Sequence, residues 1–253
     1  MQPDARAILF DLDDTLYPLR RFVLSGFAAV ARHLEHTYGI DRRESFKTLL
    51  AAFKAEHGQE LQICQKRFGL TPAVIPALVD VMRAHSPNLR LPPITRRVLA
   101  RVRDRWRVGI VTNGMSHVQA RKIEALGLDV RVDTIVFATD LGPGKPDPEP
   151  FLEAARRLNV PVSQCVFVGD DPRCDVAGAM RVGMRTIYLQ HEESDSEVDA
   201  DATVMSLDEV PETAEELLRG RPRPTETEPA APKLAKTSER RRADELVRAR
   251  RSA

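Results

Sequence analysis

Short, almost continuous apolar runs alternate along the chain with longer segments in which apolar residues recur every three or four positions. Continuous runs are typical of strands that helices cover on both faces, and the periodic segments are typical of amphipathic helices. The runs predict strands at residues 7–10, 108–111, 135–138, 166–168 and 186–189, and the periodic segments predict helices at 94–106, 116–126 and 147–158. This alternation predicts an α/β fold with a doubly wound parallel sheet.

Residues 17–87 break the alternation, because they contain no convincing strand and show helical periodicity around 22–34, 46–53 and 74–82. The segment is inserted directly after the first strand. It therefore stands at the carboxyl edge of the sheet, where open α/β sheets bind their ligands. We predict an inserted α-helical cap at 17–87 and a core formed by residues 1–16 and 88–219.

Composition narrows the class of protein. The 253 residues, 42% of them hydrophobic, suffice for a sizeable core, and three scattered cysteines are too few for a secreted disulfide framework. No apolar stretch approaches the roughly 18 residues of a membrane span, and the first residues lack the basic and then apolar order of a signal peptide. We therefore expect a cytoplasmic protein with no membrane partner.

The formal net charge of +1 hides an uneven distribution. Residues 220–253 contain ten Lys/Arg and five acids, a net charge of +5, so the remainder carries −4. Prolines interrupt this segment, and such a composition builds no core. We predict a Pro-rich, basic, disordered C-terminal extension. Nucleic acid or an acidic partner is a possible ligand for it, although a solubilising role is favoured.

Three carboxylates, Asp11, Asp13 and Asp14, follow the first predicted strand within four positions. They repel one another, so a positive group is expected among them. A hard cation such as Mg²⁺ binds one or two carboxylates and leaves its other positions to water or phosphate. The alternative for an acidic turn of this kind is a helix cap.

Three later predicted strands also end in polar residues that suit an anion or a cation. The first of these strands ends in Thr112-Asn113, the second leads through glycines to Lys145-Pro146, and the third ends in Gly169-Asp170-Asp171, followed by Asp175. Four strand ends thus supply acids, a hydroxyl, a lysine and further acids to one edge of the sheet.

These four segments resemble, in order and spacing, the four motifs of the haloacid dehalogenase (HAD) superfamily. The resemblance covers about residues 7–218. It implies a HAD-like Rossmannoid core and places the chain in the phosphatase branch with a helical C1 cap, whose substrates are small phosphorylated metabolites.

The resemblance implies a role for each motif residue. Asp11 would attack the phosphorus of a phosphomonoester and form an aspartyl-phosphate, and Asp13 would act as general acid and then as general base. Mg²⁺ would be held by the Asp11 carboxylate, the Asp13 backbone carbonyl and Asp170. Thr112, Asn113 and Lys145 would bind the phosphoryl group. Asp171 and Asp175 would orient Lys145 or metal-bound water.

Several alternatives stay open at this stage. Dehalogenases of the superfamily generally lack an acid two residues after the nucleophile, so Asp13 favours phosphate-ester chemistry. A sugar phosphomutase, a phosphonatase using one of the cap lysines Lys47, Lys54 or Lys66, and a non-catalytic phosphate-binding regulatory protein remain alternatives. The sequence does not specify the oligomeric state.

The residues after the first motif are the best candidates for substrate selection. The run Asp-Thr-Leu-Tyr-Pro resembles that of pyrimidine 5′-nucleotidase-like members, so a nucleoside 5′-monophosphate is a possible substrate. Tyr17 and Phe22 would stack on a base, and Arg20 or Arg21 would meet a second anionic group. The alternative is that Phe22 packs within the cap and both arginines are solvated.

Overall fold

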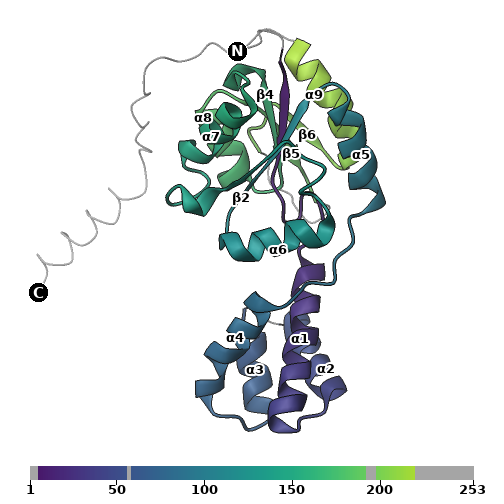
Figure 1. The fold of residues 1–253 in the computed structure, drawn as a ribbon, viewed down its shortest axis with the longest axis vertical. Helices are drawn as coiled ribbons and strands as arrows, with labels where there is room; N and C mark the ends of the chain where they lie inside the picture. Colours follow the sequence, from purple (N-terminus) through teal and green to yellow (C-terminus); the bar gives the residue numbers. More distant parts are fainter. Residues whose placement is uncertain (1–4, 56–57, 192–197, 220–253) are drawn as a thin grey trace, which may run out of the picture. The chain divides into compact units, whose positions relative to one another are not determined.

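The computed structural model describes residues 5–55, 58–191 and 198–219. Six parallel strands form one sheet in the order β3-β2-β1-β4-β5-β6 (Figure 1). The strands are β1 (Ala7–Phe10), β2 (Arg107–Thr112), β3 (Thr134–Phe137), β4 (Cys165–Gly169), β5 (Arg185–Leu189) and β6 (Ala202–Val204). The predicted α/β class and parallel sheet are confirmed.

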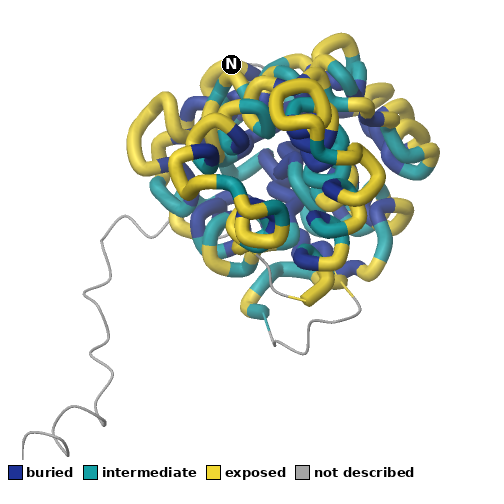
Figure 2. Tube along the Cα trace, turned by 90° about the horizontal axis from the view of Figure 1, so that it is seen from below, coloured by how far each residue is buried: buried dark blue, intermediate teal, exposed yellow. Residues whose placement is uncertain are grey.

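Helices cover both faces of the sheet because alternate strand residues point to opposite sides. On one face, Ile8 and Phe10 pack with α5 (Pro93–Arg103), α6 (Ser116–Leu126) and α9 (Val210–Arg219). On the other face, Ala7 and Leu9 pack with α7 (Pro148–Leu158) and α8 (Ala177–Arg181). The buried positions accordingly gather at the strands and on the inward sides of the helices (Figure 2).

The structure corrects some of the expected elements. β6 was not predicted, because this edge strand is short and offers only Val204 as a buried apolar residue. The helix expected to reach Trp106 ends at Arg103, and Trp106 is buried in the turn that follows it. The helix predicted at 116–126 has the expected bounds, since α6 runs from Ser116 to Leu126.

The segment predicted as a cap contains four helices, namely α1 (Arg20–Tyr38), α2 (Arg42–Ala55), α3 (Glu60–Arg67) and α4 (Ile75–Ala84). Figure 1 shows these four helices side by side, and their apolar faces share a cluster of their own that includes Phe27, Leu34, Leu49 and Leu78. None of the described helices is both long and apolar enough to cross a membrane. The predicted extension at 220–253 lies outside the described residues.

The order of the strands fixes where ligands can bind. The chain runs from β1 through β2 to β3 and then returns to place β4 on the other side of β1. The carboxyl ends of β1 and β4 are therefore adjacent, which is the crevice that doubly wound sheets use. The backbone N–H of Asp11 donates to the carbonyl of Val168 over 2.9 Å and joins the two strand ends.

Candidate active site

The four polar strand ends meet around one cavity of about 230 Å³, which we call the aspartate pocket. Its lining consists of Asp11, Asp13, Asp14, Thr112, Asn113, Lys145, Asp170, Asp171, Cys174 and Asp175. Residues from 11 to 175 thus converge, as expected where parallel strands end at a common edge.

Lys145 lies at the centre of the charges in the aspartate pocket. Its ammonium nitrogen forms ion pairs with Oδ1 of Asp11 and, over 2.7 Å, with Oδ1 of Asp175. The side chains of Lys145 and Asp175 are each 2% exposed and that of Asp11 is 11% exposed, so water screens these charges little. One buried cation is therefore shared between two buried carboxylates.

The pKa values reflect this shortage of positive charge. Burial raises the pKa of Asp11 to about 7, with a further rise from Asp175 and an opposing effect from Lys145. The pKa of Asp175 is raised by burial against the same lysine. Burial alone would lower the pKa of Lys145, but the two carboxylates outweigh it and raise that pKa. A further cation would relieve the excess of carboxylates.

Two backbone hydrogen bonds position Lys145. The amide of Asn113 donates from Nδ2 to the Lys145 carbonyl over 2.9 Å and accepts from the Lys145 N–H at Oδ1 over 2.8 Å. Gly144 approaches so closely that a Cβ there would lie 2.7 Å from Asn113 Oδ1, and its φ is +83°. Only glycine fits both demands, so the turn before Lys145 is fixed by its sequence.

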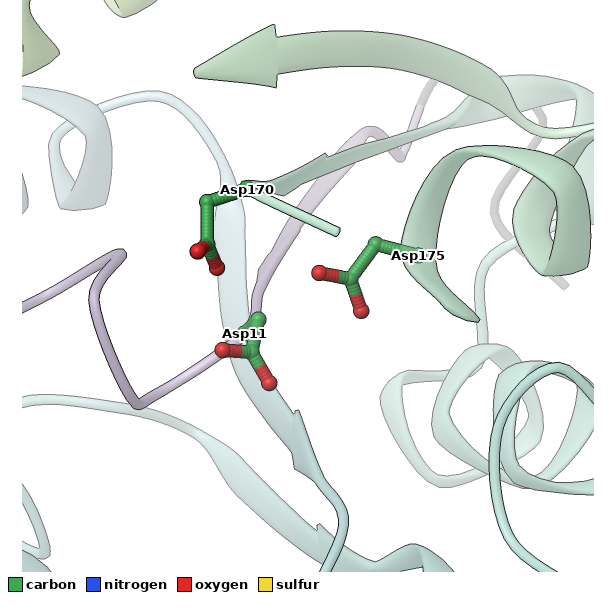
Figure 3. Close-up of side chains that lie close together, drawn as sticks. All are labelled: Asp11, Asp170 and Asp175. Carbon is green, nitrogen blue, oxygen red and sulfur yellow. The ribbon is translucent and has the colours of Figure 1, made fainter. Parts of the chain in front are cut away.

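Three carboxylates could hold a cation. Asp11, Asp170 and Asp175 each offer one oxygen, and these oxygens lie within 4.8 Å of one another. Figure 3 shows the three side chains pointing toward one another, from the ends of β1 and β4 and from the helical segment after β4. An all-oxygen donor set suits Mg²⁺. The residues present therefore fit the predicted metal.

The contacts of the three carboxylates separate their roles. Asp175 uses Oδ1 for Lys145, and Oδ2 accepts from the Asp171 N–H over 3.1 Å. It can approach so closely because residue 169 is glycine, where a Cβ would lie 2.3 Å from Asp175 Oδ2. Both oxygens of Asp175 are thus engaged, which leaves Asp11 and Asp170 as the better ligands.

Asp170 is the less enclosed of these two. Burial raises its pKa to about 6, and the negative charge of Asp11 adds to the rise. Thr15 donates from Oγ1 to Asp170 Oδ1 over 3.1 Å, and His191 Nε2 lies 3.7 Å from Oδ2.

Asp13 is enclosed by groups that the motifs did not indicate. Lys122 donates from Nζ to both carboxylate oxygens over 2.9 and 2.8 Å, Gln119 donates to Oδ2 over 3.0 Å, and the Tyr17 hydroxyl donates to Oδ1 over 2.7 Å. Gln119 also donates to Thr112 Oγ1 over 2.6 Å. Helix α6 therefore connects the residue predicted as acid and base with the predicted phosphoryl-binding threonine.

The sequence contained a signal for Gln119 and Lys122. Gln119 and Lys122 lie on the same stripe of α6 as Ile123 and Leu126, which face the core. A lysine and a glutamine on an apolar stripe need partners when buried, and both are at most 5% exposed. The helix directly follows the second motif, so Asp13 was within reach as that partner.

Two of the acidic residues serve local structure. Asp14 has a φ of +56°, and its Oδ1 accepts from the Leu19 N–H over 2.9 Å at the start of α1. Asp171 was expected to orient Lys145 or water, but its Oδ1 accepts from the N–H groups of Arg173 and Cys174 and caps the following turn. These backbone bonds outweigh burial and lower the pKa of Asp171.

The predicted substrate-selecting residues are not brought together. Tyr17 is 2% exposed within the core cluster, so its ring has no free face for a base, and its hydroxyl binds Asp13 instead. Arg20 and Arg21 are exposed, and neither lines the aspartate pocket. Phe22 packs against the ring of His85 with centroids 4.9 Å apart, and Lys122 Nζ lies 4.5 Å from its centroid.

Comparison with known proteins decides the family. A model of the haloacid dehalogenase-like hydrolases matches residues 5–183, which include all four motifs. The chain belongs to this family. The predicted membership in the HAD superfamily is thereby confirmed, together with its Rossmannoid core.

Curated HAD relatives bear on the enzyme class. The chain is 32% identical over 234 residues to the ribulose-1,5-bisphosphate 5-phosphatase of Halopiger xanaduensis, covering 84% of this chain and 98% of that protein. It is 29% identical over 195 residues to the glyceraldehyde 3-phosphate phosphatase of Methanopyrus kandleri, covering 73% and 84%. These relatives confirm the prediction of a phosphoric monoester hydrolase that acts on a small phosphorylated metabolite.

Solved HAD structures agree with the fold. A HAD phosphatase from Thermococcus onnurineus superimposes with a TM-score of 0.57 at 26% identity, covering 82% of this chain and 97% of that one. The match thus takes in most of this chain and nearly all of that phosphatase.

Proposed function

We propose that the protein is a Mg²⁺-dependent phosphatase that works through an aspartyl-phosphate on Asp11. One observation carries the proposal: the Asp11 carboxylate is buried against Lys145, faces Asp170, and lies two residues from a second carboxylate that is held by Lys122. This arrangement supplies a nucleophile, a cation for the developing charge, a metal ligand and a separate acid.

The first half of the reaction transfers the phosphoryl group. A carboxylate oxygen of Asp11 attacks phosphorus in line, a P–O bond forms, and the ester P–O bond breaks. For this step Asp13 must carry a proton, so that one of its oxygens donates instead of accepting, and it gives that proton to the departing alcohol oxygen. Lys145 stabilises the negative charge on the phosphoryl oxygens, which Thr112 and the Asn113 backbone also bind.

The second half regenerates the enzyme. Asp13, now a carboxylate, takes a proton from water, and the water oxygen bonds to phosphorus as the bond to Asp11 breaks. Phosphate leaves, and both aspartates regain their starting states. Bound Mg²⁺, held by Asp11, Asp170 and the Asp13 backbone carbonyl, would neutralise the charge between the carboxylate nucleophile and the phosphate dianion.

We propose a phosphorylated short polyhydroxylated carbon chain as the substrate, rather than a nucleoside 5′-monophosphate. Named relatives act on glyceraldehyde 3-phosphate and on ribulose-1,5-bisphosphate, and a third acts on 5-amino-6-(5-phospho-D-ribitylamino)uracil, whose phosphate stands on a ribityl chain that links it to a uracil ring. The aspartate pocket has no aromatic residue in its lining, and Tyr17 offers no face to a base. Polar groups around a small cavity suit hydroxyl groups better than a nucleobase.

The phosphonatase alternative finds no support in the described residues. It requires a cap lysine that forms a Schiff base, which needs a desolvated amine next to the substrate. Lys47, Lys54 and Lys66 are all exposed, and none lines the aspartate pocket.

The proposal is tested by measuring release of inorganic phosphate from a chromogenic phosphate ester, from triose and pentose phosphates, and from nucleoside 5′-monophosphates. We expect turnover with Mg²⁺, none with EDTA, and a loss of about four orders of magnitude or more in Asp11→Asn. Inactivity on every ester would overturn the phosphatase proposal. Isomerisation of a sugar phosphate without phosphate release would favour the mutase alternative.

A further inference from the structure

A second concave surface lies along helix α1 and carries a strong positive charge. It is a cavity of about 670 Å³ that we call the arginine groove, and its polar lining includes Arg21, Arg32, Arg42, Arg90, Ser25 and Asn88. No acidic residue lines it, and it shares no residue with the aspartate pocket. Four cations thus surround one hollow without a counter-charge in its wall.

The groove arginines have no carboxylate partners in the described part of the chain. Nine described core arginines form ion pairs with carboxylates, whereas others, among them Arg96 and Arg181, form none. None of the four groove arginines forms one within the described part of the chain, although all four are exposed. Four like charges around one cavity repel one another, and a bound anion would remove that repulsion.

The groove is built from two helices and a connecting segment. Arg21, Ser25 and Arg32 lie on α1, Arg42 begins α2, and Arg90 lies in the connection between α4 and α5. The Asn88 N–H donates to Ser25 Oγ over 2.9 Å, and Arg21 Nη1 donates to the Arg90 carbonyl over 3.4 Å. These bonds fasten the connection to α1, so the wall of the groove is held in place.

The spacing of the charges indicates the kind of anion. Arg21 and Arg90 are joined at one end of the groove, and Arg32 lies about three helical turns, or about 16 Å, further along α1. Leu24 and Ala28 lie between them in the lining. A single phosphate would reach only one end, whereas a chain of phosphates could meet arginines at both. Guanidinium groups bind phosphate oxygens in pairs, which suits such a chain.

We propose that the arginine groove is a binding site for a small polyphosphate, either inorganic or carried by a nucleoside. Single-stranded nucleic acid is a poorer match, because proteins that bind it stack bases on aromatic rings and no aromatic residue lines the groove. The site is separate from the aspartate pocket and goes beyond the proposed hydrolysis.

The test is calorimetric titration of the full chain with tripolyphosphate, with ATP and with orthophosphate in EDTA. The background is Asp11→Asn, which keeps the probes intact. We expect both polyphosphates to bind and Arg32→Gln/Arg42→Gln to weaken them by at least about tenfold. The matched control, Lys54→Gln/Lys66→Gln, removes two exposed cap charges outside the groove and should change the Kd less than about twofold.

The 220–253 segment is the same in every variant, so its charge does not enter the comparison. Unchanged binding in the arginine variant, or equal weakening in the lysine control, would overturn the proposal. Tighter binding of a single-stranded oligonucleotide than of tripolyphosphate would do so too. Comparison of tripolyphosphate with ATP shows whether the nucleoside contributes.

A second measurement needs no substitution. Phenylglyoxal modifies accessible arginines, and tripolyphosphate should protect Arg32 and Arg42 from it while leaving the exposed Arg83 reactive. Peptide mass spectrometry reports each site. Protection of none of the groove arginines would contradict the site even if the double variant failed to fold.

Discussion

The aspartate pocket and the arginine groove each bring like charges together, but within the described part of the chain only those of the pocket are paired with opposite charges. In the pocket, buried Lys145 forms ion pairs with Asp11 and Asp175. Buried Lys122 forms an ion pair with Asp13. In the groove, exposed arginines pair with no carboxylate among the described residues. Paired buried charges fix the geometry that chemistry needs, whereas unpaired exposed charges keep their capacity to bind a ligand.

Burial explains why the two regions should respond differently to substitution. A charge removed from a buried pair leaves its partner without compensation, which is costly in a medium that water screens poorly. An exposed arginine is already solvated, so its loss changes little in the folded state. The following four predictions test this difference.

Of these four, the largest effect is expected at Asp13. Asp13→Asn removes the acid and base but keeps the size of the side chain, so turnover should fall on the order of 10²-fold while the fold persists. Steady-state kinetics on the best substrate of the panel measure the loss, and circular dichroism checks folding. Full activity in a folded Asp13→Asn protein would remove Asp13 from the mechanism.

A smaller effect concerns pH and the metal. The pKa of Asp170 is raised by burial to about 6 in the folded protein, and the unfolded value is about 3.9. A raised pKa means that the folded state favours the protonated acid. Without metal, Asp170 should therefore make its full contribution to the free energy of unfolding below pH 4. This contribution should fall by on the order of 2 kcal/mol as the pH rises through 6.

Denaturant titrations between pH 4 and 8 in EDTA measure that loss. Asp170→Asn should reduce the slope of the profile without abolishing it, because the pKa of Asp11 is also raised, to about 7, and it should weaken the stabilisation that added Mg²⁺ gives the parent. A profile that keeps its slope in Asp170→Asn would show that other groups govern the pH dependence.

Lys122 tests the pairing in the pocket. Lys122→Met keeps the length of the side chain but leaves Asp13 with fewer donors, so the free energy of unfolding should fall by about 1–3 kcal/mol. In Asp13→Asn/Lys122→Met the loss should be less than the sum of the single losses, because the pair is removed together. Additive losses would mean that the ion pair contributes no coupling.

The smallest effect is expected in the groove. Arg32 has no ion-pair partner within the described residues, so Arg32→Gln should change the free energy of unfolding by less than about 0.5 kcal/mol. The same denaturant titration measures it next to Lys122→Met. A loss of unfolding free energy as large as that of Lys122→Met would show that Arg32 stabilises the fold, which contradicts a role in ligand binding alone.

The sequence predicted the sheet well because its central strands are continuous apolar runs. It missed β6, an edge strand whose three residues bury only Val204. The gathering of Asp11, Lys145 and Asp170 followed from their places at strand ends. The partners of Asp13 did not follow, because the position of Lys122 depends on how α6 packs against the sheet.

Tyr17 shows the other limit. Its place after the first motif indicated a substrate-facing ring, yet its hydroxyl binds Asp13 and the ring is buried. Sequence patterns locate a side chain along the chain, but the direction in which a loop residue points depends on contacts with distant segments. The groove arginines likewise come from α1, α2 and the connection at residue 90, and no sequence spacing joins them.

The most direct test of the account is whether Asp11 becomes phosphorylated during turnover. Purified protein with Mg²⁺ and an active phosphate ester is quenched in acid within one turnover, digested, and examined by mass spectrometry. The account predicts one added phosphoryl group on the peptide that contains Asp11, and none in Asp11→Asn. Turnover with no phosphorylated peptide under these conditions, or with the phosphoryl group on another residue, would contradict it.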